Sequence, residues 1–319
     1  MFIAVDAGGT STRAVVLDAA GSVLGNGRSG GGNPTSVGVT AAVAAIGAAV
    51  EGAIVRVPAS DIEAVVLALA GERTDAFTTE LSECLGRLQL GPVVLQPDLL
   101  AMFGSGTYRL EGYGVIAGTG SIAAQIRDGS LHRVVGGKGW LLGDAGSGFW
   151  IGHQVARAVV SALDGQGPDT ALTPLVLDAL RIPAEPATSA LRQLVSALYA
   201  RRPVQLAEFA PLAFGAYEDP VAKDILSTAA DALADLLAAV QEPGLDGPVV
   251  LGGSVLVRGF LAGPAELRHR LRLPEEPVLA SDGVVGAAVL ALRGAGVMVD
   301  EEIFQRLRAG VAARSAPLP

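Results

Sequence analysis

Cysteine is almost absent from this chain of 319 residues, in which Cys84 is the only example. One thiol cannot form an intrachain disulfide, a zinc site made of several thiolates or an iron–sulfur centre held by one chain. We therefore expect a protein of a reducing compartment, the cytoplasm. The three histidines, His132, His153 and His269, lie far apart in the sequence and lack the spacing of metal ligands.

Basic charge is also scarce, because 23 lysines and arginines stand against 32 aspartates and glutamates, for a net charge of -9 and a pI of about 4.9. Nucleic acids and anionic membrane surfaces bind basic patches, so neither is an expected partner. No segment approaches the ~20 unbroken apolar residues of a membrane span. The apolar N-terminal run is too short for a signal peptide and meets Asp6 without a basic leader.

Three common catalytic motifs are missing as well. No G-x-x-x-x-G-K-[ST] phosphate loop occurs, and no G-x-G-x-x-G opens the first strand–helix–strand unit. No G-x-S-x-G elbow joins a strand to a helix. These absences argue against a P-loop nucleotidase, a dinucleotide-dependent enzyme and a serine hydrolase.

What the chain does contain is a high hydrophobic fraction, 50%, and length enough for two domains at ~100 to 200 residues each. It opens with MFIAVDAGGTSTRAVVLD, which predicts strand, tight turn, strand. Gly8 and Gly9 bare the backbone beside the hydroxyls of Thr10 and Ser11, as a phosphate site requires. Asp6 could hold a hydrated metal there. An ordinary glycine-rich hairpin is the alternative.

The opening pattern recurs. Residues 113–120 and 122–127 predict two strands around the turn Gly118-Thr119-Gly120-Ser121, and the strand 248–251 runs into a third turn, Gly252-Gly253-Ser254-Val255. Two copies of one hairpin, about a domain apart, suggest a duplicated fold with a cleft between its halves. Chance recurrence in a chain with 42 glycines is the alternative.

Strands and helices alternate between these turns, which predicts a mainly parallel α/β sheet with functional groups at the carboxyl ends of its strands. Asp98 follows such a strand. The glycine-rich stretch 21–36 predicts a loop, in which Asn33 could bind a polyol or cap a helix. Further strands are expected at 62–69 and 92–95, and helices at 40–57, 77–89, 147–160, 172–180, 187–200, 219–241, 284–293 and 301–308, with a frayed tail from residue 309.

The densest passage is GGKGWLLGDAGSGFWIG, residues 136–152. It contains both tryptophans, Trp140 and Trp150, for which core filling is the plain interpretation. Asp144 lies ahead of a predicted helix, so it could cap that helix, bind a ligand or do both.

These motifs resemble the actin, hexokinase and heat-shock-protein superfamily, with Asp6 to Thr10 as its first phosphate motif, Gly118 to Ser121 as its second and Gly252 to Val255 as its adenosine motif. The passage 136–152 is similar to the block that marks N-acetylglucosamine kinases and the BadF/BadG/BcrA/BcrD ATPase family. The resemblance implies an α/β fold of duplicated ribonuclease H-like domains with an interdomain cleft. Domains are expected at 1–117, joined by a C-terminal helix at about 295–310, and at 118–294.

The resemblance also implies ATP-dependent phosphorylation of N-acetylglucosamine or a related amino sugar, at the 6-hydroxyl, with Mg²⁺. Asp98 would be the general base and Asp6 would hold the metal. The implied nucleotide-binding residues are Gly8, Gly9, Thr10, Ser11, Gly118, Thr119, Gly120, Gly253 and Ser254, and the implied sugar-binding residues are Asn33, Asp98, Gly137, Lys138, Gly139 and Asp144.

Three positions depart from the family pattern around the sugar. Pro97 replaces the usual Asn before Asp98, Lys138 stands where an aromatic residue is common, and Ala145 replaces Glu. A cation at position 138 could favour a substrate with a carboxylate or phosphate. Two other functions stay open: an ATPase that activates a partner enzyme, against which the single cysteine speaks, and a sugar or nucleotide sensor without catalysis. The sequence also leaves a homodimer open.

Overall fold

The computed structural model describes residues 1–319 except 70, 72, 73 and 316–319. Contacts divide the chain into two compact units, which we call unit 1 (1–110, 128–130 and 280–319) and unit 2 (111–127 and 131–279). The units change at positions 110 and 280, whereas the sequence placed domain boundaries at 117 and 294. The assignment of these segments as ATPase domains stays a prediction.

Unit 1 contains a five-stranded sheet in the order β3-β2-β1-β4-β5. The hairpin β1–β2 predicted for the first residues is present and antiparallel, whereas β4 and β5 run parallel to β1. A second antiparallel strand, β3, continues the hairpin. The strand bounds are β1 Phe2–Ala7, β2 Thr12–Leu17, β3 Val23–Ser29, β4 Ala64–Leu69 and β5 Val93–Pro97.

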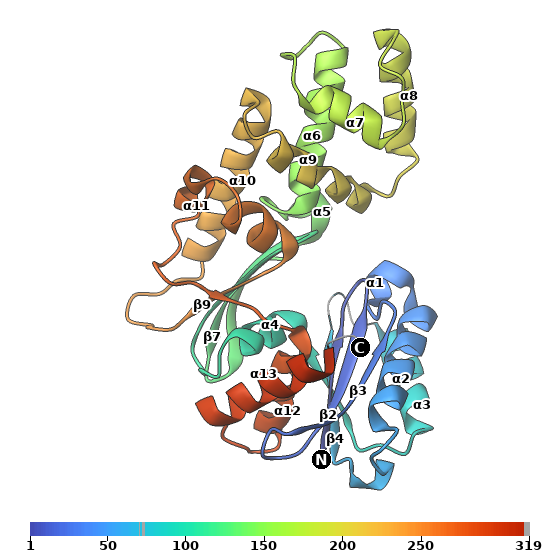
Figure 1. The fold of residues 1–319 in the computed structure, drawn as a ribbon, viewed down its shortest axis with the longest axis vertical. Helices are drawn as coiled ribbons and strands as arrows, with labels where there is room; N and C mark the ends of the chain where they lie inside the picture. Colours follow the sequence, from blue (N-terminus) through green and yellow to red (C-terminus); the bar gives the residue numbers. More distant parts are fainter. Residues whose placement is uncertain (70, 72–73, 316–319) are drawn as a thin grey trace. The chain divides into compact units, whose positions relative to one another are not determined.

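Helices cover both faces of this sheet (Figure 1). Ile3, Val5 and Ala7 of β1 pack with α2 and α3, while the alternate residue Asp6 faces the N-terminus of α12. Each large apolar side chain buried in this way stabilises the fold by ~1.5–3 kcal/mol. The helices of unit 1 are α1 Pro34–Val37, α2 Val39–Ile54, α3 Asp75–Gly86, α4 Asp98–Gly106, α12 Gly283–Gly294 and α13 Glu301–Ser315, with a short 3-10 turn at Ala59–Asp61.

Unit 2 repeats the strand arrangement, in the order β10-β9-β6-β7-β8. An antiparallel hairpin, β6–β7, is again followed by a further strand at its side, β8, and β9 and β10 are parallel to β6. The two orders are the same when read from opposite edges, which agrees with the predicted duplication. The strand bounds are β6 Gly112–Ala117, β7 Ser121–Arg127, β8 Ser130–Gly136, β9 Val249–Gly252 and β10 Val278–Leu279.

The larger core of unit 2 lies between this sheet and a set of helices whose apolar faces meet at Phe209, Phe260 and Leu226. None of the described helices of the protein is long and apolar enough to cross a membrane. The helical segments are α5 Gly139–Leu142, α6 Gly148–Leu163, α7 Leu172–Ala179, α8 Ala187–Tyr199, a 3-10 segment Pro203–Phe209, α9 Ala210–Gly215, α10 Pro220–Ala238, a π-helical segment Val255–Leu261 (η3) and α11 Ala265–Arg270.

Three sequence expectations about local structure are wrong. The stretch 21–36 is not all loop, because it contains β3. A Cβ atom at Gly25 or Gly27 would lie 2.1 or 2.0 Å from a carbonyl oxygen of α2, so glycine is what lets this strand pack on the helix. Helix α13 continues to Ser315, past the expected end at 308. Trp140 is half exposed, whereas Trp150 packs on the core.

Candidate active site

In unit 1, the predicted acids meet at one edge of the sheet. Asp6 is in register with Ala68 of β4, and Ala68 is in register with Gln96 of β5. Asp98 follows two residues later, as the first residue of α4. The parallel strands thus bring Asp6 and Asp98 close enough for their charges to interact, as the alternation of strands and helices predicted.

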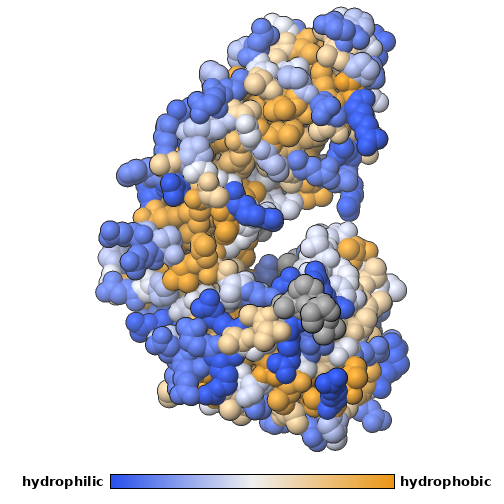
Figure 2. Space-filling view, viewed as in Figure 1, coloured by the Kyte–Doolittle hydropathy of each residue, from blue (hydrophilic) through white to orange (hydrophobic). Residues whose placement is uncertain are grey.

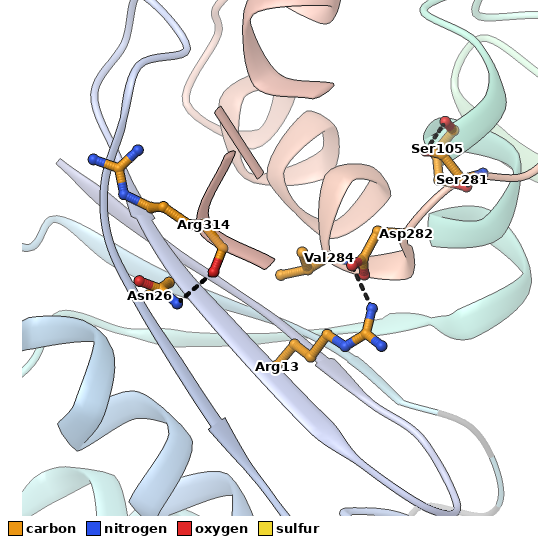
Figure 3. Close-up of polar contacts among 7 residues, drawn as sticks. All are labelled: Arg13, Asn26, Ser105, Ser281, Asp282, Val284 and Arg314. Atoms are coloured by element: carbon orange, nitrogen blue, oxygen red, sulfur yellow. Dashed lines mark hydrogen bonds and ion pairs between the residues drawn. The ribbon is translucent and has the colours of Figure 1, made fainter. Parts of the chain in front are cut away.

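Asp6 lies against the N-terminus of α12. A Cβ atom at Gly283 would be 2.5 Å from one Asp6 oxygen, so only glycine allows this approach. The preceding residue, Asp282, caps α12 by accepting a hydrogen bond from the Val284 amide at 3.2 Å, and it forms an ion pair with Arg13 (Figure 3). A third carboxylate therefore stands beside the two that the sequence identified.

This environment changes the acidity of Asp6. The pKa of its carboxyl is raised from 3.8 to about 6, first by burial and then by the negative charges of Asp282 and Asp98, against the lowering effect of Arg13. A carboxylate in such surroundings gains most from a bound cation, because the cation offsets both the burial and the repulsion.

The turn after β1 is held from the neighbouring loop. The Gly8 carbonyl accepts hydrogen bonds from the amides of Gly32 and Asn33 at 2.9 and 3.1 Å, and the Gly8 amide donates to the Ser11 carbonyl at 3.0 Å. Gly9 and Thr10 at the tip are exposed. The turn is therefore fixed in place with its tip open, as the predicted phosphate contact requires.

Asn33 takes the structural role that the sequence left as an alternative. Its side-chain oxygen accepts a hydrogen bond from the Thr35 amide at 2.9 Å and caps α1. The same side chain lies beside Gly71, where an added Cβ would meet it at 2.8 Å. Its sugar contact stays a prediction.

Pro97 fits its position before Asp98 without loss of sheet pairing. Strand β5 is an edge strand and Pro97 is its last residue, a place where a missing amide hydrogen is tolerated. Asp98 accepts a hydrogen bond from the Leu99 amide at 2.8 Å. The departure from the family pattern therefore changes the neighbour of the proposed base and not the course of the backbone.

In unit 2, the second turn packs on the start of α6. The amides of Gly148 and Phe149 donate to the carbonyls of Gly118 and Thr119 at 2.7 and 3.1 Å. Asp144 accepts from the Ser121 amide at 3.3 Å and is buried, which raises the pKa of its carboxyl.

The cap of α6 is not Asp144. Ser147 is the cap, because its hydroxyl accepts a hydrogen bond from the Trp150 amide at 3.1 Å. Ahead of Asp144, the residues Gly137, Lys138 and Gly139 are exposed, with left-handed backbone at both glycines. Asp144 and this loop thus have different surroundings, although the sequence assigned all of them to the sugar.

A cavity of about 430 Å³ opens in unit 2 where the turns at residues 118–121 and 252–255 meet. Gly118, Thr119 and Ser254 line it, which brings together predicted residues from both turns. Gly253 lies behind them with φ +90°, and a Cβ there would be 2.3 Å from the Ala117 carbonyl oxygen. The volume falls in the range of ~300–1,000 Å³ typical of small-molecule and cofactor sites.

Several proteins of known name or structure are similar to this chain. N-acetyl-D-glucosamine kinase of Dictyostelium discoideum is 30% identical over 92% of this chain and 98% of its own, and glucosamine kinase GspK of Vibrio cholerae is 28% identical over 83% and 89%. A crystal structure from Chromobacterium violaceum, provisionally assigned as an N-acetylglucosamine kinase, aligns with a TM-score of 0.70 and 29% identity over 91% of this chain and 98% of that one.

The model of the BadF/BadG/BcrA/BcrD ATPase family matches residues 3–291. The chain belongs to this family. Membership confirms the predicted resemblance, the α/β fold of the actin and hexokinase type, and the enzyme class, a phosphotransferase with an alcohol group as acceptor.

At the two sites of this family member, the structure places several residues that the sequence did not single out. Asp282 and Arg13 lie beside Asp6, and Phe214 and Arg258 line the unit 2 cavity. Arg258 could have been predicted as a site residue from the sequence, since it lies in η3, one helical turn after the predicted site residue Ser254. Phe214 had no such signal, because its segment reads only as an apolar helix.

Proposed function

We propose that this chain transfers the γ-phosphoryl group of ATP to a hydroxyl group, the 6-hydroxyl, of N-acetylglucosamine or a related amino sugar. The observation that carries the proposal is the position of Asp98 beside Asp6 at adjacent carboxyl ends of parallel strands. Similarity to amino-sugar kinases along nearly their full length supports the choice of acceptor.

In the proposed reaction, Asp98 accepts the proton of the sugar hydroxyl while the hydroxyl oxygen bonds to the γ-phosphorus. The bond from that phosphorus to the bridging oxygen breaks, and ADP leaves with the electron pair. Because phosphoryl transfer needs mainly positioning and charge neutralisation, one base and fixed phosphate contacts suffice. Asp98 is the first residue of α4, so the end of β5 and the start of this helix fix the position of its carboxylate.

The donor set fits Mg²⁺. This ion binds oxygen ligands and, with nucleotides, uses one or two carboxylates together with phosphate oxygens and water. Asp6 supplies one carboxylate and Asp282 stands beside it, and the described residues contain no set of three or more His, Cys, Asp or Glu side chains placed to hold one metal ion together. Bound Mg²⁺ would supply neutralisation of phosphate charge, and Asp6 is the residue that we propose to hold it.

We assign the nucleotide to the 430 Å³ cavity of unit 2. Its wall combines apolar side chains, Phe214 and Pro211, with the turn residues Gly118 and Thr119. Apolar walls suit a base and ribose, whereas backbone amides of glycine-rich turns suit phosphates. Gly8 to Ser11 of unit 1 would contact the phosphates as well, and Asn33, Gly137 to Gly139 and Asp144 are the proposed sugar contacts.

The deciding experiment measures ADP release with a panel of sugars: glucose, glucosamine, N-acetylglucosamine, N-acetylmuramic acid, and 6-deoxy-N-acetylglucosamine. We expect turnover with at least one amino sugar and none with its 6-deoxy form, and phosphorus NMR of the product should show coupling to the C6 protons. Turnover of the 6-deoxy sugar would contradict the 6-hydroxyl assignment. ADP release that no sugar stimulates would contradict the kinase proposal.

A Lys138→Tyr variant sharpens the choice of sugar. If Lys138 selects an acidic substrate, this variant lowers kcat/KM for N-acetylmuramic acid and leaves that for N-acetylglucosamine close to the wild-type value. Equal effects on both sugars would show that Lys138 does not select for charge. Arg133→Gln, a change at another exposed cation of unit 2, is the matched control.

A further inference from the structure

Unit 1 has a small cavity, of about 130 Å³, on the sheet face that α12 and α13 cover. Three of the residues that line it are arginines from three different elements: Arg13 of β2, Arg28 of β3 and Arg314 of α13. Asn26 and Val311 also belong to its wall. In a chain with net charge -9, such a concentration of cations around one small cavity is unusual.

The strand register places two of these arginines side by side. Arg13 is paired with Arg28 across β2 and β3, and Asp6 is paired with Arg13 across β1 and β2. All three therefore project from the same face of the sheet, in one row. Like charges directly opposite one another on neighbouring strands repel, so the pair Arg13–Arg28 is unfavourable unless an anion lies between or beside them.

The protein's own carboxylates neutralise only part of this charge. Arg13 forms its ion pair with Asp282 (Figure 3), whereas the side chains of Arg28 and Arg314 form no ion pair with any described residue. Arg28 and Arg314 are also exposed, so a ligand can reach them. These two exposed arginines therefore have no carboxylate partner among the described residues.

The backbone of the third arginine is tied to the sheet, while its guanidinium points away from that of Arg13 (Figure 3). The Asn26 side chain donates a hydrogen bond to the Arg314 carbonyl oxygen at 3.4 Å and ties the end of α13 to β3 (Figure 3). Val311, one turn earlier on α13, lines the same cavity. The end of the helix is therefore part of the wall. Elsewhere on α13 the charged residues Glu301, Glu302 and Arg308 are exposed. Figure 2 shows both hydrophilic and hydrophobic residues on the visible face of unit 1.

We propose that this cavity is a binding site for a phosphate group, either as inorganic phosphate or as the phosphate of a small ester. Guanidinium groups bind phosphate with paired, charge-assisted hydrogen bonds, which suits a site built from arginines. A cavity of about 130 Å³ suits a small anion such as one phosphate group and lies well below the ~300–1,000 Å³ of sites for larger ligands.

The site has a direct link to the acids of unit 1. A phosphate bound here shares Arg13 with Asp282, the residue that caps α12 beside Asp6. Binding of phosphate would therefore weaken the ion pair between Arg13 and Asp282. The cavity is built from residues of unit 1 alone, and phosphate binding there does not depend on the proposed sugar kinase activity.

Calorimetry tests the proposal with inorganic phosphate as the first probe. The protein is first saturated with magnesium and a non-hydrolysable ATP analogue, and with N-acetylglucosamine, so that nucleotide and sugar sites are filled. We expect one phosphate to bind wild type, Arg28→Gln and Arg314→Gln to weaken it about tenfold or more each, and Arg87→Gln to leave it unchanged. Arg87 is an exposed arginine at the end of α3, on the other side of the sheet.

Thermal unfolding supplies a second readout that does not need calorimetric heat. Phosphate should raise the Tm of wild type and of Arg87→Gln but not that of Arg28→Gln. Without phosphate, Arg28→Gln should be at least as stable as wild type, because the repulsion between Arg28 and Arg13 is gone. Glucosamine 6-phosphate is the second probe: tighter binding than inorganic phosphate identifies an ester as the ligand, and equal binding identifies the free ion.

Two results would overturn the site. One is that wild type binds neither probe once the nucleotide and sugar sites are filled. The other is that Arg87→Gln weakens binding as much as Arg28→Gln, which would mean that the binding depends on net charge and not on the cavity. Both are distinct from failure of the kinase proposal, which is measured by sugar-dependent ADP release and would leave phosphate binding intact.

Discussion

Units 1 and 2 use the same strand order and a glycine-rich hairpin turn at the same place, yet the turns differ in length, residues 8–11 against 118–120, and in chemistry. Aligning the hairpins places Asp6-Ala7-Gly8 of β1 beside Ile116-Ala117-Gly118 of β6. In both turns a neighbouring loop or helix donates to the carbonyl of the first glycine, from Gly32 in unit 1 and from Gly148 in unit 2. This backbone hydrogen bond is therefore common to the two turns, whereas the acidic residue before the turn, Asp6, has Ile116 as its counterpart in unit 2.

What packs on each turn explains the difference. In unit 1 the N-terminus of α12 brings Asp282 next to Asp6, so the turn stands beside carboxylates. In unit 2 the turn meets α6 and η3, and the neighbouring space is a cavity with Phe214 and Pro211 in its wall. These surroundings agree with the proposed roles, acid–base and metal chemistry for the turn of unit 1 and nucleotide binding for the turn of unit 2.

The largest expected effect comes from removing the proposed base of unit 1. Asp98→Asn should lower sugar-dependent ADP release at least ~100-fold, because an amide cannot accept the proton. Binding of the ATP analogue, measured by calorimetry, should stay near wild type. The control is Asp75→Asn, which changes an exposed acid at the first position of α3. Equal activity of the two variants would remove Asp98 from the mechanism.

The second prediction concerns Asp6 and stability. Its folded-state pKa of about 6, above the usual 3.8, means that without metal the free energy of unfolding falls as pH rises from about 4 to 6. The Asp6→Asn variant has no carboxyl to ionise at this position, so its free energy of unfolding should not fall over this pH range. It should exceed that of wild type by ~1 to 3 kcal/mol at pH 7 and equal it below pH 4. Urea unfolding at both pH values measures this.

Magnesium should reverse the order of those two proteins. It should stabilise wild type and leave Asp6→Asn unchanged, because the variant lacks the carboxylate that is proposed to hold the ion. Equal stabilisation of both proteins by magnesium would show that the metal binds elsewhere. Asp18→Asn, an acid at the far end of the same hairpin, is the matched control.

A smaller effect is expected in the unit 2 cavity. Phe214→Ala should weaken binding of the ATP analogue up to about tenfold, since an aromatic wall contributes ~0.5–1.5 kcal/mol beyond its buried area. Phe209→Leu changes an aromatic residue of the same core that does not line the cavity and serves as the control. If both variants lose affinity equally, the loss reflects general loosening of unit 2.

The smallest effect separates the two roles of Asn33. Asn33→Ala should lower the free energy of unfolding by about 1 kcal/mol through loss of the helix cap, whereas Asn33→Asp keeps an acceptor oxygen and should not. A raised KM for the sugar in both variants would support a sugar contact. A raised KM in neither would leave Asn33 as a cap alone.

The features of the fold and site that could be predicted from the sequence are those encoded by neighbouring residues. Alternation of apolar strands and helices predicted the sheet of each unit, and glycine with hydroxyl residues marked both hairpin turns. Position along the chain also placed Asp98 at a strand end. These features are local, so a single stretch of sequence contains the information.

Other features depend on distant partners. Strand β3 looked like loop because Gly25 and Gly27 lower strand propensity, and only the presence of α2 shows why glycine is needed there. The sequence around Asp282 does not indicate that this residue lies beside Asp6, because Asp6 is at the other end of the chain. Phe214 reads as ordinary core until η3 is folded beside it. The site residues themselves stay predictions until the variants are measured.

The order in which the chain is made has a consequence for unit 1. Helix α12, which packs on β1, β4 and α4, belongs to a segment that follows the whole of unit 2 in the sequence. At ~5–20 residues per second, the ribosome needs roughly 9 to 35 s to pass from the end of α4 to the start of α12. During that time the apolar face of the first sheet lacks its covering helix. All segments of unit 2 are synthesised before α12, so we expect the nascent N-terminal third to expose apolar surface for longest.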